Sequence, residues 1–354
     1  MVKKLIFFLS ITFLGFSQSI NYAVLNNQAF VMNSVIALKA SYLRVNDDLD
    51  FLNMRESELG TLSKYGSTIG DMSGYEAEIG FGLSDKDSIF LNFQEWNIDY
   101  GGSKLSNKKI ELFNRFNLVS NQFSYINSLS FDIGYIMDFA NRVEITNSGL
   151  MNSMIKKVSP NSDYSISDNG TILKNGSETT IYDKDSGNKI SPSVAIDNLL
   201  SNSYYLKILA GKKISRKSIL NLYSSYYYVD IQSDVKISKE LLQNFSVANL
   251  NRSEHILNLG VSLISEFKYL IFEINYEYNK IYRDNLEYMN YSHNLDIAIS
   301  KPITKNLLFF VSGKMMFQQL NRDIPYLYNQ YTESQFDKKY GFAKFGLIYK
   351  IKGF

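Results

Sequence analysis

The stretch YINSLSFDIGYIMDF, residues 125–139, alternates between apolar and polar side chains along most of its length. One face carries the apolar and aromatic residues Tyr125, Leu129, Phe131, Ile133, Tyr135, Met137 and Phe139. The opposite face carries the polar residues Ser128, Ser130, Asp132 and Asp138. A period of two predicts a β-strand with one apolar and one polar face. A strand that separates lipid from a wet interior needs this pattern.

The same alternation recurs along the chain. The connections between these segments are alternately short turns and longer polar loops. We expect about twelve strands, near residues 33–45, 74–83, 88–100, 109–119, 125–139, 204–212, 218–231, 255–264, 269–282, 293–300, 307–320 and 340–354. Within 88–100 the apolar residues near Leu91 are out of phase with Trp96, and a bulge would reconcile them. An even number of antiparallel strands, with both ends on one side, predicts an all-β transmembrane barrel with short periplasmic turns and long extracellular loops.

Residues 1–19 have the features of a secretory signal peptide. Lys3 and Lys4 give a positive start, and a mostly apolar stretch follows from Leu5 to Leu14. That stretch is too short to span a bilayer as a helix. We therefore expect export, with the barrel over residues 33–354. Residues 20–32 then form a periplasmic tail, a further strand or a plug that enters the lumen.

Composition excludes several classes of function. The chain contains no cysteine, which excludes disulfides, thiolate metal sites and a cysteine nucleophile. The formal net charge is +2 and falls to zero once Lys3 and Lys4 are removed, so nothing argues for nucleic acid as a partner. Trp96 is the only tryptophan, so aromatic girdles at the membrane surfaces must be built from Tyr and Phe. We expect no metal and no cofactor.

The largest insertion, about residues 140–203, is rich in Asn, Ser, Asp, Lys and Gly. The pairs Asn169-Gly170 and Asn175-Gly176 predict small hairpins that stand above the barrel wall. We expect this insertion to be a large extracellular loop.

The alternation directs twelve charged side chains to the interior: Glu76, Glu78, Glu111, Arg115, Asp132, Asp138, Lys207, Glu273, Glu277, Asp296, Lys314 and Lys344. An outward Arg or Lys would cost on the order of 2–4 kcal/mol at the lipid midplane. These residues are therefore candidates to line a pore, and their acidic excess favours cations or basic solutes. Alternatively, the basic members pair with the acidic ones and fill the lumen. Twelve strands lie between the eight that leave room only for side chains and the roughly sixteen that leave an aqueous channel.

The sequence contains little that resembles a catalytic site. A serine hydrolase needs a histidine within reach of a serine, and the chain has only His255 and His293. Ser292 and His293 are neighbours on one strand and point to opposite faces. Ser253 and His255 share a face near the rim. The His–Ser spacing and following Asn-Gly of phospholipase-type barrels are absent, so we expect no enzyme.

With these features, the chain resembles the outer-membrane β-barrel proteins of Gram-negative bacteria as a broad class, over nearly all of its expected mature length. In that class, a terminal aromatic residue after an alternating apolar strand implies recognition by the barrel-assembly machinery. Phe354 is the aromatic residue here, and the alternation is formed by Phe345, Leu347, Tyr349 and Ile351, one residue out of step with Phe354. The resemblance also implies a place in the cell outer membrane, against its lipid and lipopolysaccharide.

We expect passive, porin-like passage of small hydrophilic solutes through a narrow and mildly acidic lumen. Two alternatives remain open from the sequence. One is a non-conducting surface, adhesion or structural barrel. The other is a transporter of hydrophobic compounds, which needs a lateral opening or a plug.

Overall fold

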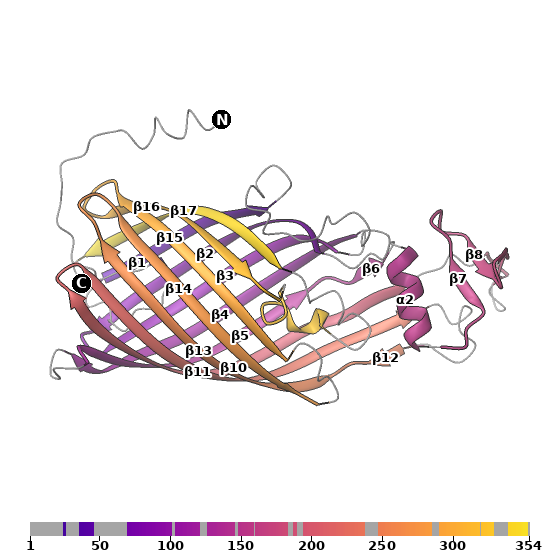
Figure 1. Cartoon of the computed structure of the whole chain (residues 1–354), viewed down its shortest axis with the longest axis horizontal. Coiled ribbons are helices and arrows are strands. Elements are labelled where there is room, and N and C mark those ends of the chain that lie inside the picture. Colours follow the sequence, from indigo (N-terminus) through magenta and orange to yellow (C-terminus); the bar gives the residue numbers. More distant parts are fainter. Residues whose placement is uncertain are drawn as a thin grey trace.

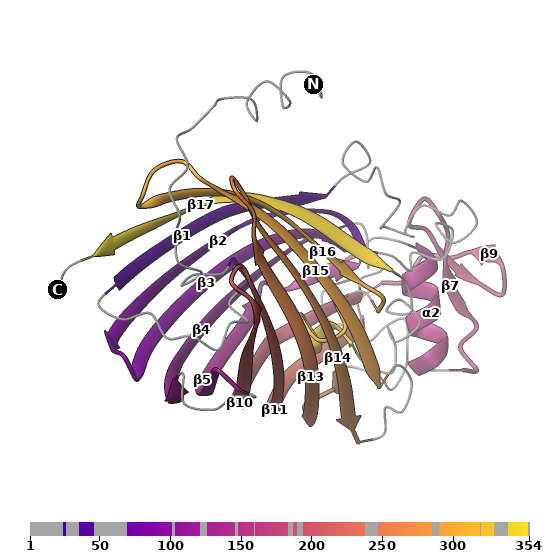
Figure 2. The same ribbon diagram turned by 60° about the vertical axis from the view of Figure 1, so that its left-hand side comes forward.

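Twelve long antiparallel strands form a closed barrel (Figures 1 and 2). The computed structural model describes residues 24–25, 35–45, 69–100, 103–120, 126–145, 148–158, 160–182, 187–189, 194–237, 247–284, 290–318, 320–328 and 339–352. The wall strands are β1 (Val35–Val45), β2 (Ile69–Ser84), β3 (Asp87–Tyr100), β4 (Ser103–Ser120), β5 (Ser128–Ala140), β10 (Val194–Ser215), β11 (Ser218–Ile237), β13 (Arg252–Glu266), β14 (Ile271–Arg283), β15 (Tyr291–Pro302), β16 (Leu307–Met316) and β17 (Tyr340–Lys352). The predicted fold class and strand number are confirmed.

The first and last strands close the ring. β1 pairs with β17 over ten residue pairs, from Val35 opposite Lys352 to Arg44 opposite Ala343. Each of the other wall strands pairs with its neighbours in the chain, so the barrel has no open edge along the wall. Within the described part of the chain, no helix has the length and apolar character to cross a membrane.

Connections of two kinds define the two ends of the barrel. Short connections follow β2, β4, β10, β13 and β15, and we call this the short-turn end. The remaining connections are at the long-loop end, and most of them are longer. Residues 1–19, most of 20–32, and Phe354 lie outside the described residues.

A small folded extension stands beyond the long-loop end (Figure 1). It contains helix α2 (Ser148–Val158) and a three-stranded sheet of β7 (Tyr164–Ile166), β8 (Ile172–Lys174) and β9 (Ser177–Glu178). The β8–β9 turn has positive φ at Asn175 (49°) and Gly176 (80°), as the Asn-Gly pair predicted. Two short strands, β6 (Val143–Ile145) and β12 (Val247–Asn249), lengthen the sheet beside β10 and β11. Nothing in the pattern predicted α2.

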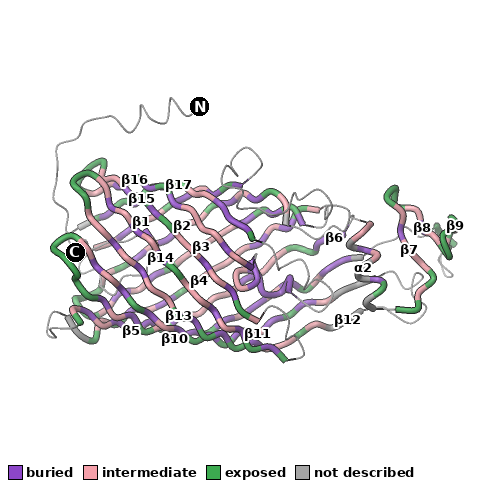
Figure 3. Tube along the Cα trace, viewed as in Figure 1, coloured by how far each residue is buried: buried purple, intermediate pink, exposed green. Residues whose placement is uncertain are grey.

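The wall has an apolar outer face and a largely polar inner face. Along β5, Ser128, Ser130 and Asp132 are buried inside, whereas Ile133 is 48% exposed on the outside. The exposed and buried residues alternate along the strands in Figure 3. Exposed leucine, isoleucine, tyrosine and phenylalanine side chains occur on every wall strand from β1 to β17. Only lipid can cover such a surface, and a closed barrel satisfies its own backbone groups there. The chain is therefore a barrel of the cell outer membrane.

Three sequence expectations need correction. β10 begins at Val194, so the large insertion ends about ten residues before Ser203. β16 ends at Met316 rather than Leu320. The bulge expected within 88–100 is absent, because β3 pairs with β4 without a register shift from Asp87 to Tyr100.

The reason for the missing bulge is an apolar zone inside the barrel. Trp96, Ile98 and Tyr100 point inward and are buried near the long-loop end. The ring of Trp96 packs edge-on against Phe342 of β17, with ring centroids 5.8 Å apart. These inward apolar residues therefore pack against other apolar side chains inside the barrel. The strand can keep one alternation along its whole length, so it needs no bulge.

Two interior tyrosines pack on glycines of neighbouring strands. A Cβ at Gly134 would lie 2.3 Å from the ring of Tyr205, and a Cβ at Gly260 would lie 2.0 Å from the ring of Tyr223. Both glycines face inward, so the rings lie flat along the wall instead of projecting across the lumen. Glycine inside a strand marks such a close approach.

Candidate functional site

A loop from the long-loop end folds into the barrel (Figure 2). This inward loop, residues 320–328, lies between β16 and β17 and contains the 3₁₀ turn η3 (Pro325–Leu327). Its apolar side chains are fully buried: Leu320, Ile324, Tyr326, Leu327 and Tyr328. The turn contacts β10 and β11, which lie on the far side of the ring from β16. The loop therefore crosses the lumen.

Hydrogen bonds fix the inward loop to strands around the wall. The hydroxyl of Tyr326 donates to Asn107 Oδ1 on β4. Arg252 Nη2 of β13 donates to the carbonyl of Pro325 at 2.8 Å. The guanidinium of Arg283 on β14 lies 4.0 Å from the ring centroid of Tyr328. Contacts on three separate wall strands hold the loop in one position.

Two charged residues of the inward loop pair with wall residues of opposite charge. Arg322 forms an ion pair with Glu277 of β14. Asp323 Oδ1 lies 2.8 Å from Lys314 Nζ of β16, and its backbone carbonyl accepts a hydrogen bond from Lys109 Nζ at 3.2 Å. Burial opposes the charge of Asp323, but the attraction of Lys314 and then Lys109 outweighs it and lowers the pKa of Asp323 to about 2. The loop is thus held by charge as well as by packing.

A second segment reaches into the lumen ahead of β1. Glu273 of β14 accepts hydrogen bonds from the backbone N–H groups of Val24 and Leu25, at 2.7 and 3.1 Å. Lys39 Nζ of β1 donates to the carbonyl of Val24 at 2.6 Å. Because β14 begins at the short-turn end, Glu273 and these two residues lie toward that end. Most of the segment expected as tail, strand or plug lies outside the described residues.

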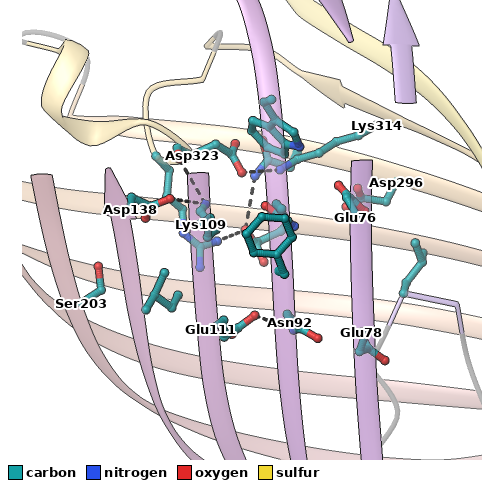
Figure 4. Close-up of a pocket in the computed structure, with 18 of the residues that line it drawn as sticks. Glu76, Glu78, Asn92, Lys109, Glu111, Asp138, Ser203, Asp296, Lys314 and Asp323 are labelled. Atoms are coloured by element: carbon teal, nitrogen blue, oxygen red, sulfur yellow. Dashed lines mark hydrogen bonds and ion pairs between the residues drawn. The ribbon is translucent and has the colours of Figure 1, made fainter. Parts of the chain in front are cut away.

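A cavity of about 300 Å³ lies between the inward loop and Val24–Leu25 (Figure 4). Among the described residues, its lining contains seven carboxylates: Glu76, Glu78, Glu111, Asp138, Glu277, Asp296 and Asp323. It contains five basic side chains: Lys39, Lys109, Lys314, Arg322 and Lys344. The cavity is therefore polar and carries a formal excess of two negative charges.

All twelve charged residues that the alternation directed inward do point into the barrel. Eight of them line the cavity: Glu76, Glu78, Glu111, Asp138, Glu277, Asp296, Lys314 and Lys344. The other four lie elsewhere on the inner wall: Arg115, Asp132, Lys207 and Glu273. Arg115 and Asp132 form a buried pair with two bonds of 2.8 Å, and Lys207 Nζ lies 4.4 Å from the ring centroid of Tyr223.

Ion pairs neutralise much of this lining, as the filled-lumen alternative anticipated. Lys344 Nζ lies 2.9 Å from Glu76, and Lys109 Nζ lies 3.4 Å from Asp138. Arg115 pairs with Asp132 nearer the short-turn end. The pairs narrow the lumen, yet they leave the cavity between them.

Some residues of the site were not among the predicted candidates. Lys39 and Lys109 fall on the inward phase of their strands, so alternation alone identifies them. Arg322 and Asp323 lie in a segment that reads as an outer loop, and only its apolar run Ile324–Tyr328 hinted at burial. The inward tyrosines Tyr205, Tyr223 and Tyr227 also fall on the inward phase of their strands, and glycines lie opposite two of them.

The two histidines lie on the outer face of the barrel. Tyr226 Oη is 2.6 Å from His255 Nδ1, and Tyr276 Oη is 2.7 Å from His293 Nδ1. Ser253 Oγ meets the hydroxyl of Tyr228 at 3.1 Å. These contacts belong to an aromatic surface that faces outward. Within the described residues, no three acidic or histidine side chains converge as a metal site requires.

The expected assembly strand is β17. Phe345, Leu347, Tyr349 and Ile351 all point outward and are 38–53% exposed. They therefore form one apolar stripe along the closing strand, and its role in assembly remains a prediction.

Comparison with known proteins found likeness in structure only. No family model matches the chain, and no curated protein matches its sequence. The translocator domain of the autotransporter NalP from Neisseria meningitidis is similar over 90% of this chain and 88% of its own, with 8% identity and a TM-score of 0.47. The toluene transporter TodX from Pseudomonas putida is similar over 96% and 95%, with 8% identity and a TM-score of 0.44. The NanC porin is similar over 89% and 100%, with 9% identity and a TM-score of 0.43.

Proposed function

We propose that this barrel is a narrow channel for passive passage of small hydrophilic solutes across the outer membrane. The long-loop end then faces the exterior and the short-turn end faces the periplasm. The observation that carries the proposal is the charged cavity of about 300 Å³ inside the barrel.

The chemistry of the lining supports hydrophilic cargo. Among the described residues, seven carboxylates and five basic groups line the cavity. An apolar solute would displace the water around these charged groups without replacing its hydrogen bonds. The acidic excess favours cations and basic solutes over anions. We assign no catalytic role, because each histidine is on the outer face and bonded to a tyrosine.

The inward loop and Val24–Leu25 limit what can pass. Both line the cavity, one toward each end, so the route is far narrower than the ring of strands. We propose that the inward loop sets the size limit from the exterior side. On the periplasmic side, Val24 and Leu25, whose backbone groups are held by Glu273 and Lys39, set the size limit.

Flux into proteoliposomes tests this function. Purified protein in vesicles is expected to admit small polar solutes, with rates that fall steeply as solute size increases. Arg322→Gln with Asp323→Asn, which removes both ion pairs of the loop, should raise the size limit. Absence of flux in both proteins, with the barrel shown to be folded by circular dichroism, would contradict the proposed function.

The extension of α2 and β7–β9 favours a second function, binding at the cell surface. It has its own buried residues, Met151, Ile155, Ile166 and Ile172, and therefore a fixed shape. Excision of residues 148–189 leaves β6 and β10 intact. If the extension binds a cell or a phage, this excision abolishes attachment and leaves solute flux unchanged.

A further inference from the structure

We infer that the cavity selects small cations that carry N–H donors, and that Glu111 and Asp296 bind them. This inference rests on the proposed passage of solutes and names the class of solute. Its basis is the pattern of ion pairs around the cavity, together with buried acceptor oxygens that have no donor.

Every basic side chain of the cavity is already engaged with an acidic one. The pairs are Lys39–Glu78, Lys109–Asp138, Lys314–Asp323, Lys344–Glu76 and Arg322–Glu277. Two lining carboxylates, Glu111 and Asp296, form no ion pair within 4 Å among the described residues. The cavity's excess of negative charge therefore belongs to these two groups.

Glu111 is surrounded by neutral hydrogen-bond donors and by amide oxygens that accept no hydrogen bond from other described residues. Its carboxylate accepts hydrogen bonds of 2.8 Å from the hydroxyl of Tyr205 and from Asn92 Nδ2. Asn92 lies directly opposite Glu111 in the β3–β4 register, and Gln94 comes two residues later on β3. Asn92 and Gln94 also line the cavity, and their side-chain oxygens are buried and accept no hydrogen bond from the described part of the chain. Buried acceptors of this kind call for a donor.

The inward loop keeps Asp296 without an ion pair. Lys314 lies directly opposite Asp296 in the β15–β16 register, but its ammonium group contacts Asp323 of the loop at 2.8 Å. Within the described part of the chain, Asp296 accepts one hydrogen bond, from Asn275 Nδ2 at 3.1 Å. The docked loop thus brings the ammonium group of Lys314 into an ion pair with Asp323 rather than with Asp296.

The two carboxylates face one cavity from opposite parts of the wall. β4, which carries Glu111, and β15, which carries Asp296, are six strands apart around the twelve-strand ring. Figure 4 shows both side chains around the same space. A cation in transit meets acceptor oxygens on both sides. Ammonium and guanidinium groups can donate to the carboxylates and to the amide oxygens, whereas a methylated cation cannot.

Reversal potentials in planar bilayers test the inference. With guanidinium on one side and tetramethylammonium on the other, wild-type protein should prefer guanidinium. Glu111→Gln combined with Asp296→Asn should reduce that permeability ratio at least about tenfold, because the loss of even one charge-assisted hydrogen bond corresponds to about that factor. Gln94→Glu, which replaces one of these amides with a carboxylate near Asn92 and Glu111, should increase the ratio.

Glu78→Gln is the matched control. It removes one carboxylate charge from the same cavity, as each half of the double variant does, but it leaves the acceptors around Glu111 in place. It should lower cation over anion selectivity without changing the guanidinium preference. An unchanged ratio in the double variant, or an equal change in Glu78→Gln, would overturn the inference while leaving passage intact. Absence of current in every variant, loop-released ones included, would instead overturn the proposed function.

Discussion

Asp323→Asn is expected to release the inward loop from the wall. At neutral pH the lowered pKa of Asp323, about 2 against an ordinary 3.8, measures how strongly the docked state favours the charged carboxylate. A difference of nearly two pKa units corresponds to about 2 kcal/mol of docking free energy. Loss of that energy raises the undocked population roughly 30-fold. Lys314 is then free to pair with Asp296.

Thiol labelling measures that population. The chain has no cysteine, and Leu327 is fully buried in the docked loop, so Leu327→Cys supplies a single reporter. In this background, Asp323→Asn should raise the labelling rate by about the same factor of 30. Asp99→Asn, at an exposed position on β3, is the matched control and should leave the rate unchanged. A rise of less than about threefold, or an equal rise in the control, would refute the electrostatic account of docking.

The lowered pKa of Asp323 also determines how docking of the inward loop depends on pH. A carboxylate with a lowered pKa contributes its stabilisation above the ordinary value, and the contribution is lost as pH falls. The wild-type loop should therefore stay docked from neutral pH to about 3.8 and loosen between 3.8 and about 2. Trp96, the only tryptophan, lines the cavity, and its fluorescence should report a transition in that window. Asp323→Asn should show no such transition.

Three further outcomes concern the wall. Gly134→Ala should destabilise the barrel in urea by about 1–3 kcal/mol, because the new Cβ meets the ring of Tyr205, whereas Gly313→Ala finds ordinary space and should be nearly neutral. Arg115→Met should cost about 3–5 kcal/mol by removing the guanidinium that pairs with buried Asp132, and adding Asp132→Leu should recover most of that loss in the same unfolding assay. Ile133→Arg places a charge on the lipid face and should cost about 2–4 kcal/mol when unfolding is measured from lipid vesicles; a neutral result would show that this face does not meet hydrocarbon.

The wall was predictable from sequence because lipid outside and polar groups inside impose a strict period of two. Alternation gave the strand number, the inward phase of Glu111 and Asp296, and the outward stripe that ends at Ile351. It failed at Trp96, where an apolar residue points inward because Phe342 covers it. It also missed the start of β10, since Asp197 and Asn198 interrupt the pattern and the β10–β11 register shifts between Asp197 and Leu200.

The site was less predictable because its decisive contacts join distant parts of the chain. Asp323 and Lys109 are 214 residues apart, and Val24 and Glu273 are 249 apart. No local pattern reveals that a polar loop turns inward or that a wall lysine prefers a loop carboxylate. The inward charges were visible in the sequence, but their pairing became visible only in the folded barrel.

Single-channel recording of the purified barrel tests the central claim most directly. Wild-type protein should show small, cation-selective current steps, and the Arg322→Gln, Asp323→Asn variant should show larger steps that are less selective for cations. Folded protein that gives no current steps in either form would contradict a conducting lumen. Steps of equal size in both would contradict the role of the inward loop.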